Sequence, residues 1–439
     1  MEATLQEILD ARENRAQRRS QLLAQYKKPV ICFTMNIAGP EKYSPLIARG
    51  FALGCEALVA QLEGIPILHE ERLPRITGCE AFFVADAPAE QLKALTVQLE
   101  DATPLGRLFD MDVTDETGHT LTRQSERPCL LCSNSARICG RSRTHSVQQL
   151  QERTKAILRD AVRDALARRI SAVASQALLW EVCTTPKPGL VDRENSGSHC
   201  DMDIFTFMSS TAALQHYFAD CAKAGFDLPD PAICFARLRF LGKQALPQML
   251  HATGGVNTHK GAIFTMGLLC AAAARLEDAG AASAESVLEE VKQLCKGLCA
   301  HDFAGITEEN AVTVGQRLYA QFGITGVRGQ AEQGYTAVLY TGLPVLEEGL
   351  ALGYSLERAG CAALLAMLTA TADTNMIARS DRTTAQKYTR EVALLLARDR
   401  YPDSDKLRTL DSLFTAAGLS PGGSADLLAA TYFLHLLCK

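Results

Sequence analysis

The sequence predicts a multidomain protein in which an N-terminal α/β (or α+β) domain, residues 1–146, is followed by a larger all-α globular domain, residues 147–439. Two observations support this prediction. Up to about residue 146, short apolar runs typical of strands alternate with helical patterns, as in layered α/β and α+β domains. Beyond it, one helical pattern follows another, with neither a convincing strand nor a repeat period. The boundary depends on this change alone, because no linker rich in Pro, Gly or Ser marks it.

The first domain is predicted from alternating segments. Its strand-like runs cover residues 29–37, 65–68, 81–84, 105–113 and 119–123. Its helical patterns cover residues 4–28, 44–62 and 89–99. The first of these helices is amphipathic and rich in basic residues.

The second domain is predicted from helical patterns that Gly or Pro turns mostly separate. They cover residues 147–182, 205–224, 232–250, 262–276, 284–300, 308–322, 330–352, 356–372, 383–397, 405–416 and 424–437. The first is long enough for two helices. The pattern over 262–276 is apolar on nearly every face, which is typical of a helix buried in a core.

Composition and charge exclude several classes of protein. The chain has 439 residues, enough for two or three domains with sizeable cores, and its formal net charge of -5 argues against a nucleic-acid binder held by a basic field. It has no apolar run long enough to span a bilayer and no signal-peptide pattern, so we expect a cytoplasmic protein without a membrane partner. Its 15 cysteines lack framework spacing, which favours reduced thiols over disulfides.

Two acidic residues alternate along a predicted strand in the motif Gly106–Arg107–Leu108–Phe109–Asp110–Met111–Asp112. Residues i and i+2 of a strand point the same way, so Asp110 and Asp112 would form a carboxylate pair on one face. Such a pair can hold Mg²⁺, which usually shares its coordination shell with substrate phosphates. An exposed edge strand with two solvated acids is the alternative interpretation.

A second motif has the spacing C-x₂-C-x₆-C-x₅-H and consists of Cys129, Cys132, Cys139 and His145. Three cysteines and a histidine make a plausible Zn²⁺ ligand set, although this is not a standard finger spacing and core cysteines are the alternative. Three basic residues lie within the motif, and their guanidinium forks suit phosphate oxygens, with a solvated turn as the alternative. They are Arg137, Arg141 and Arg143.

In the second domain, the polar loop 254–261 precedes the apolar pattern over 262–276. It would bring Asn257, His259 and Lys260 to the N-terminal end of a core helix. Backbone N–H groups and the helix dipole favour an anion there, typically a phosphate. An ordinary Gly-rich turn with a polar cap is the alternative.

Further polar loops between the later helices supply carboxylates and cations. The carboxylates are Asp192, Asp201, Asp203, Glu332, Asp373 and Asp426, and the cations are Lys187, His259, Lys260 and Arg328. If the helices pack antiparallel, these groups would converge on a pocket suited to a metal–polyphosphate substrate. A cap or turn role is the alternative for each residue, and Asp203 and Ser424 occupy good N-cap positions.

Four of these motifs together resemble the triphosphoribosyl-dephospho-CoA synthases. They lie at residues 187–192, 255–261, 328–332 and 422–426. The first domain resembles the apo-citrate lyase phosphoribosyl-dephospho-CoA transferases, through the 106–112 motif and the segment from Cys129 to His145. The whole chain is therefore similar to a bifunctional fusion of two families that usually occur as separate chains.

The resemblance implies two consecutive reactions. The all-α domain would join ATP to 3′-dephospho-CoA: a ribose 2′-hydroxyl attacks C1′ of ATP, adenine leaves and the triphosphate is kept. The first domain would then pass the phosphoribosyl-dephospho-CoA unit to a serine of the citrate lyase acyl-carrier subunit and release pyrophosphate. ATP and 3′-dephospho-CoA are the implied substrates, and Mg²⁺ is the implied cofactor.

These reactions give the candidate residues roles. Displacement of adenine passes through an oxocarbenium-like state and requires a base for the 2′-hydroxyl, for which Asp192, Asp201 and Glu332 remain unranked candidates. Asp110 and Asp112 would hold Mg²⁺ on the phosphate under attack and on the departing pyrophosphate. The candidate phosphate-binding residues are Arg107, Arg141 and Arg143 in the first domain, and Lys187, Asn257, His259, Lys260 and Arg328 in the second.

Two other functions are consistent with the motifs. A glycohydrolase acting on ATP or ADP-ribose would use water, in place of dephospho-CoA, as the acceptor. A non-catalytic assembly module would use the segment from Cys129 to His145 as a zinc knuckle that docks the carrier protein, with the helical domain as a scaffold.

Overall fold

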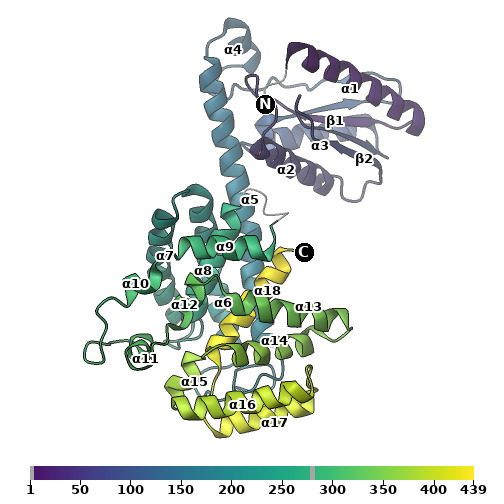
Figure 1. The fold of residues 1–439 in the computed structure, drawn as a ribbon. Helices are drawn as coiled ribbons and strands as arrows, with labels where there is room; N and C mark the ends of the chain where they lie inside the picture. Colours follow the sequence, from purple (N-terminus) through teal and green to yellow (C-terminus); the bar gives the residue numbers. More distant parts are fainter. Residues whose placement is uncertain (1–3, 277–281) are drawn as a thin grey trace. The chain divides into compact units, whose positions relative to one another are not determined.

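A computed structural model describes residues 4–276 and 282–439 (Figure 1). Contacts divide the chain into two compact units, Met1–Ala165 and Leu166–Lys439. The division lies inside helix α5 (Val147–Cys183), whereas the change of sequence pattern occurs near residue 146. The reason is that Ile157 and Leu158, on the first half of α5, pack into the core of the first unit.

The first unit contains a five-stranded sheet with the order β2-β3-β1-β4-β5. Its strands are β1 (Val30–Met35), β2 (Ile67–Leu73), β3 (Glu80–Ala85), β4 (Phe109–Thr114) and β5 (Thr120–Leu121). Its helices are α1 (Leu5–Tyr26), α2 (Pro45–Gln61), α3 (Ala89–Ala102) and α4 (Ala136–Ser142), with a 3-10 turn at Gly106–Leu108. Every pair of neighbouring strands is antiparallel. Of the two fold classes predicted for this domain, α/β and α+β, the structure therefore has the second.

Helices cover both faces of the two central strands, as Figure 1 shows. On one face, Leu22 of α1 packs with Val30 and Cys32 of β1. On the other face, Phe51 of α2 stacks on Phe33 of β1, with ring centroids 4.7 Å apart. Because both faces are buried, β1 and β3 appear in the sequence as continuous apolar runs with no alternation.

In the described residues of the second unit, 166–276 and 282–439, all the secondary-structure elements are helices, which confirms the predicted all-α domain. After α5 come α6 (Ile204–Asp227), α7 (Pro231–Ala252), α8 (Lys260–Arg275), α9 (Ala284–Leu294), α10 (Leu298–Asp302), α11 (Val314–Phe322), α12 (Gly326–Glu332), a π-helix (Val338–Gly342), α13 (Leu343–Ala351), α14 (Leu356–Ala370), α15 (Thr374–Arg379), α16 (Arg382–Arg398), α17 (Ser404–Ala416) and α18 (Gly422–Leu437). None of the described helices combines the length and apolar character needed to cross a bilayer.

Some predicted helices have different limits in the structure. The pattern over 147–182 forms one helix, α5. The pattern over 330–352 was wrong as a single helix, because Gly334 and Tyr335 have φ values of +73° and +49° and end α12. The pattern over 284–300 is interrupted in the same way at Gly297, where φ is +78°. The short α15 was not predicted.

Helix α8 lies in the core of the second unit, and nearly all of its residues after Gly261 are buried, as its apolar sequence predicts. It packs against α6 at close range. A Cβ atom on Gly225 of α6 would lie 2.2 Å from the backbone oxygen of Ala271 in α8. The absence of a side chain at this position therefore sets the separation of the two helices.

We expect Gly225→Ala to destabilise the second unit by about 1–3 kcal/mol, because the backbone of α8 cannot yield as a flexible side chain would. Gly242→Ala in α7 is the matched control: its Cβ would lie 3.6 Å from Ile263 and Tyr217, an ordinary contact, so it should be neutral or slightly stabilising. Denaturant unfolding of the full chain measures both. Equal midpoints for the two variants would contradict the close-packing interpretation.

Candidate active sites

The second unit contains a cavity of about 1320 Å³ whose wall combines apolar and charged side chains. Of the predicted phosphate-binding residues, Lys187, Asn257, His259, Lys260 and Arg328 all line it. The carboxylates that line it are Glu181, Asp201, Asp302, Asp373 and Asp426. Asp192 and Glu332, two of the candidate bases, are not among its lining residues.

The loop between α7 and α8 opens the N-terminal end of α8 to the cavity. Gly254 and Gly255 have φ values of +64° and +93°, which allow the chain to reverse between the helices. Lys260 is the first residue of α8 and is exposed, as is Asn257. Within residues 4–276 and 282–439, neither side chain has a hydrogen-bond or ion-pair partner, so both are available to an anion at the helix terminus.

His259 lies at the N-cap position of α8 and is only 3% exposed. Its Nδ1 lies 2.7 Å from Ser210 Oγ, and its buried Nε2 has no hydrogen-bond partner in the part of the chain that the structure describes. Burial, together with the charge of Lys187, lowers the pKa of His259 to about 3. The ring is therefore neutral near pH 7, and it offers the cavity a hydrogen-bonding atom and no positive charge.

Asp426 of α18 lies against the N-terminus of α8. A Cβ atom on Gly261 would be 1.9 Å from its Oδ2, so glycine at position 261 is what allows this approach. Among residues 4–276 and 282–439, no group donates a hydrogen bond to Asp426 or pairs with it. Burial, and the charges of Glu181 and Asp373, raise its pKa well above the ordinary value. Asp426 is thus suited to accept or give up a proton.

Glu181 and Lys187 form an almost completely buried ion pair at the C-terminal end of α5, with side chains 5% and 1% exposed. Lys187 Nζ also donates to the backbone oxygen of Glu181, at 2.7 Å. Glu181 was not predicted, although a charged residue within the apolar run 177–182 was a usable signal. Lys187 is therefore balanced by a carboxylate before any substrate arrives.

Asp373 joins two helix N-termini beside the cavity. Its Oδ1 accepts from the backbone N–H groups of Asn375 (2.9 Å) and Met376 (3.1 Å), and its Oδ2 accepts from the N–H (2.7 Å) and Oγ (2.9 Å) of Ser424. The prediction of Ser424 as an N-cap was wrong, because α18 begins at Gly422 and the cap position belongs to Pro421. The prediction for Asp203 is confirmed: it caps α6.

Arg328 shares the carboxylate of Asp302 with Arg239. Arg328 Nε donates to Asp302 Oδ2 at 2.8 Å, and Arg239 pairs with Oδ1. Although burial opposes it, hydrogen bonds from Arg239, His301 and Arg328 lower the pKa of Asp302 to about 2. Arg239 and Lys243, which also line the cavity, were not predicted; their i,i+4 spacing in the helical pattern 232–250 was the available signal.

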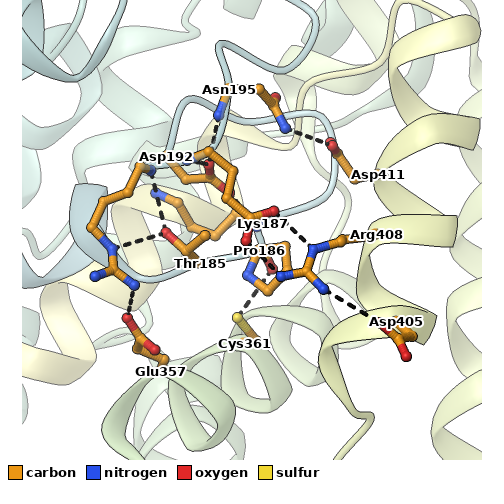
Figure 2. Close-up of polar contacts among 12 residues, drawn as sticks. Thr185, Pro186, Lys187, Asp192, Asn195, Glu357, Cys361, Asp405, Arg408 and Asp411 are labelled. Atoms are coloured by element: carbon orange, nitrogen blue, oxygen red, sulfur yellow. Dashed lines mark hydrogen bonds and ion pairs between the residues drawn. The ribbon is translucent and has the colours of Figure 1, made fainter.

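Asp192 organises the loop that follows α5, as Figure 2 shows. Its carboxylate accepts from the backbone N–H groups of Lys187 (2.8 Å), Glu194 (2.7 Å) and Asn195 (3.1 Å). Asn195 is fixed in turn by Asp411, at 3.0 Å. These contacts give Asp192 a structural part in the loop, and its predicted role as a base stays a prediction.

Glu332 lies at the last position of α12, where its Oε2 accepts from the backbone N–H of Cys299 at 3.3 Å. This bond joins α12 to α10. The two charged residues of the 328–332 motif therefore have different surroundings. Arg328 faces the cavity, whereas Glu332 packs on the neighbouring helix, α10.

In the first unit, Asp110 and Asp112 project from the same face of β4, as the strand period predicts. Phe109, Met111 and Val113 alternate with them along the strand and are buried, whereas Asp110 is half-buried and Asp112 is exposed. Burial, and then the charge of Asp112, raise the pKa of Asp110. In residues 4–276 and 282–439, neither carboxylate makes an ion pair, so a cation that separates the two charges would be stabilising.

Side chains bind the outer edge of β4, because β5 pairs only with Val113 and Thr114. Lys93 donates to the backbone oxygen of Met111 at 3.0 Å, and Arg127 donates to that of Phe109 at 2.8 Å. Buried Glu100 accepts from the N–H of Met111 at 2.9 Å. The backbone on both sides of Asp110 is thus held by three charged side chains.

The candidate phosphate-binding arginines of this unit have different surroundings. Arg107 donates to the backbone oxygen of Pro128 and pairs with Asp101 at 3.4 Å, so its guanidinium is engaged within the protein. Arg141 and Arg143, at the C-terminal end of α4, are exposed. Cys129, Cys132, Cys139 and His145 converge, with their ligand atoms within 4.8 Å of one another.

Two family models match the chain in succession. Residues 3–161 match the family described as apo-citrate lyase phosphoribosyl-dephospho-CoA transferase, and residues 167–439 match the family described as ATP:dephospho-CoA triphosphoribosyl transferase. The two matches meet inside α5, where contacts also divide the chain.

Several curated proteins are similar over nearly the whole chain. The protein CitXG of Haemophilus influenzae is 34% identical, over 98% of this chain and 95% of its own length. The protein CitXG of Leuconostoc mesenteroides is 30% identical, over 99% and 97%. A 2-(5″-triphosphoribosyl)-3′-dephosphocoenzyme-A synthase of Pectobacterium atrosepticum is 38% identical over 60% of this chain and 86% of its own length.

We expect Lys187→Met to destabilise the second unit by about 3–5 kcal/mol, because it leaves the carboxylate of Glu181 buried without a partner. The double variant Lys187→Met/Glu181→Gln removes both charges and should recover much of that loss. Lys406→Met is the control, since its ion pairs with Asp399 and Asp403 are exposed and should contribute little. Denaturant unfolding measures all three. A double variant less stable than Lys187→Met would contradict the ion-pair interpretation.

Proposed function

The chain belongs to the family of CitXG proteins, with the domains of both transferase families, and on this premise we propose how its residues perform the two reactions. It is a bifunctional transferase that makes the prosthetic group of citrate lyase and installs it. In the first reaction, ATP and 3′-dephospho-CoA give 2′-(5″-triphosphoribosyl)-3′-dephospho-CoA and adenine. In the second, the phosphoribosyl-dephospho-CoA unit of this product is transferred to a serine of the apo form of the citrate lyase acyl-carrier subunit, and pyrophosphate is released.

We assign the first reaction to the cavity of the second unit. One observation supports this. The carboxylate of Asp426, which has no partner among the described residues, lies against the N-terminus of α8. ATP enters with its Mg²⁺, and its triphosphate binds to Lys260, Asn257 and the first N–H groups of α8. Lys243 and the exposed part of Arg328 add positive charge to the same cavity.

Asp426 is the proposed base. The 2′-hydroxyl of dephospho-CoA gives its proton to this carboxylate as its oxygen attacks C1′ of ATP. The bond from C1′ to adenine breaks, and the departing base takes a proton from water and leaves as neutral adenine. A raised pKa makes Asp426 a better base than an ordinary aspartate, and its negative charge stabilises the oxocarbenium-like transition state. Glu181 is less suited, because Lys187 already neutralises it.

His259 is proposed to orient the substrate. It is neutral, and its Nε2 is the one ring atom left for a ligand, since Nδ1 is engaged with Ser210. If the Ser210 hydroxyl donates to Nδ1, Nε2 carries the proton and donates to a substrate oxygen. A buried donor of this kind is strong because water does not compete with it.

We assign the second reaction to the polar face of β4. Asp110 and Asp112 are the residues that would hold Mg²⁺, and the ion would neutralise charge on the phosphate under attack and on the departing pyrophosphate. Their carboxylates point the same way and have no ion-pair partner among the described residues, which fits this donor set. Arg141 and Arg143 are exposed cations on the same unit for the polyphosphate or the carrier.

Lys260→Ala and Asp426→Asn should each lower the rate of adenine release, by on the order of 10²–10³-fold, because each removes a group that acts on the transition state. The full chain is incubated with ATP, Mg²⁺ and 3′-dephospho-CoA, and adenine and the adduct are followed by mass spectrometry. Lys292→Ala, an exposed lysine of α9, is the control. Unchanged adenine release would remove the residue from the site. Adenine without an adduct would indicate a glycohydrolase.

Asp110→Asn should lower transfer to the carrier on the order of a hundredfold or more, while adenine release stays unchanged. The assay supplies preformed triphosphoribosyl-dephospho-CoA and apo carrier, and the modified carrier is measured by mass. Asp86→Asn is the matched control, because Asp86 makes only an exposed pair with Lys28. Transfer by Asp110→Asn at the normal rate would refute the Mg²⁺ assignment.

A further inference from the structure

Four ligand atoms converge in the segment that follows the β4–β5 hairpin, and no part of the proposed chemistry uses them. We propose that Cys129, Cys132, Cys139 and His145 bind a structural Zn²⁺ that holds residues 127–145 against the edge of β4. The segment has two such ligands before α4, one within it and one after it.

The distances between the ligand atoms are those of a tetrahedral site. The four ligand atoms lie within 4.8 Å of one another, with Cys132 Sγ 3.4 Å from Cys139 Sγ and 3.3 Å from His145 Nε2. A Zn²⁺ ion at about 2.3 Å from sulfur and about 2.0 Å from nitrogen requires ligand separations of roughly 3.5–3.8 Å. Small shifts of the side chains would satisfy this geometry.

The local backbone also has the form of a metal-binding turn. The N–H of Leu131 lies 3.5 Å from Cys129 Sγ, an N–H to sulfur contact that stabilises a thiolate. The turn is closed by the bonds from Cys129 N to Asn134 O (2.7 Å) and from Ala136 N to Arg127 O (2.8 Å). These bonds keep the first two cysteines on the same side of the chain.

Few apolar side chains hold the segment in place: Leu130 packs, partly buried, against the core of the first unit. Cys139 is the buried residue of α4, whereas Ile138 is 60% exposed and Leu131 is 36% exposed. A seven-residue helix with one buried position is not stable by its own packing. A fully ligated metal supplies the missing free energy, as it does in other small segments without a core.

Two arginines connect this segment to β4. Arg127, two residues before Cys129, donates to the backbone oxygen of Phe109 at 2.8 Å and pairs with Glu100. Arg107 donates to the backbone oxygen of Pro128. Because Phe109 adjoins Asp110, ordering of the segment positions the carboxylate on which the proposed transfer depends. The zinc ligands are therefore positioning residues for the second reaction and have no part in adenine release.

Metal analysis of the full chain tests the site. We expect about one equivalent of Zn²⁺ per chain, and Co²⁺ in its place should give the thiolate charge-transfer and visible bands of a tetrahedral site. His145→Ala should lower the affinity at least tenfold, roughly the loss that even an outer-shell change causes. His145→Cys should keep the metal, and Cys438→Ser, an exposed cysteine elsewhere, should match the wild type. Equal zinc affinity in His145→Ala and wild type, or a disulfide between Cys132 and Cys139, would overturn the proposal.

The activity arm rests on the proposed function of the first unit. Zinc removal, with Mg²⁺ supplied, should abolish transfer to the carrier and leave adenine release unchanged in the same sample; zinc restores transfer. Transfer that is unaffected by zinc removal would overturn the positioning role. A zinc-loaded chain that never transfers the prosthetic group would refute the proposed function, and the metal analysis would still support the site.

Discussion

The buried ion pair between Lys187 and Glu181 is the interaction on which the helical unit's site depends. Two charges removed from water are tolerated only when they are paired closely, so the pair fixes the end of α5 and the start of the loop after it. The same loop then places the carboxylate of Asp192 where it accepts three backbone N–H groups. The charges of this part of the cavity wall are therefore already satisfied within the protein.

Elsewhere in the cavity, some charged groups have partners within the protein and others have none among the described residues. Asp302 is neutralised by two arginines and Asp373 is saturated by donors from two helices, whereas Asp426 has no such partner in the described chain. Lys260 is likewise open at the N-terminus of α8. A free carboxylate beside a free anion site is the arrangement that a reaction between a hydroxyl and a triphosphate substrate requires.

In the first unit, the unpaired groups are the backbone N–H and C=O groups at the outer edge of β4. β5 covers only one end of β4, and the remaining backbone edge would be exposed. Lys93, Glu100 and Arg127 bind part of it with side chains, where a neighbouring strand would otherwise pair. The edge is therefore both protected from pairing and kept accessible, and the cysteine and histidine segment follows directly from Arg127.

The sequence by itself determined the two-part architecture, most of the helices, the shared face of Asp110 and Asp112, and the loop with Lys260, because hydrophobic periodicity and helix ends are local properties. It did not separate Asp192 and Glu332 from Glu181 and Asp426, nor predict that Ser424 donates to Asp373. The packing of helices that are distant in sequence decides which carboxylate faces the cavity. Asp426 reaches α8 only because Gly261 lacks a side chain, and Glu181 is buried there in an ion pair with Lys187. Burial and partners set each carboxylate's charge and basicity, and both exist only once the tertiary structure has formed.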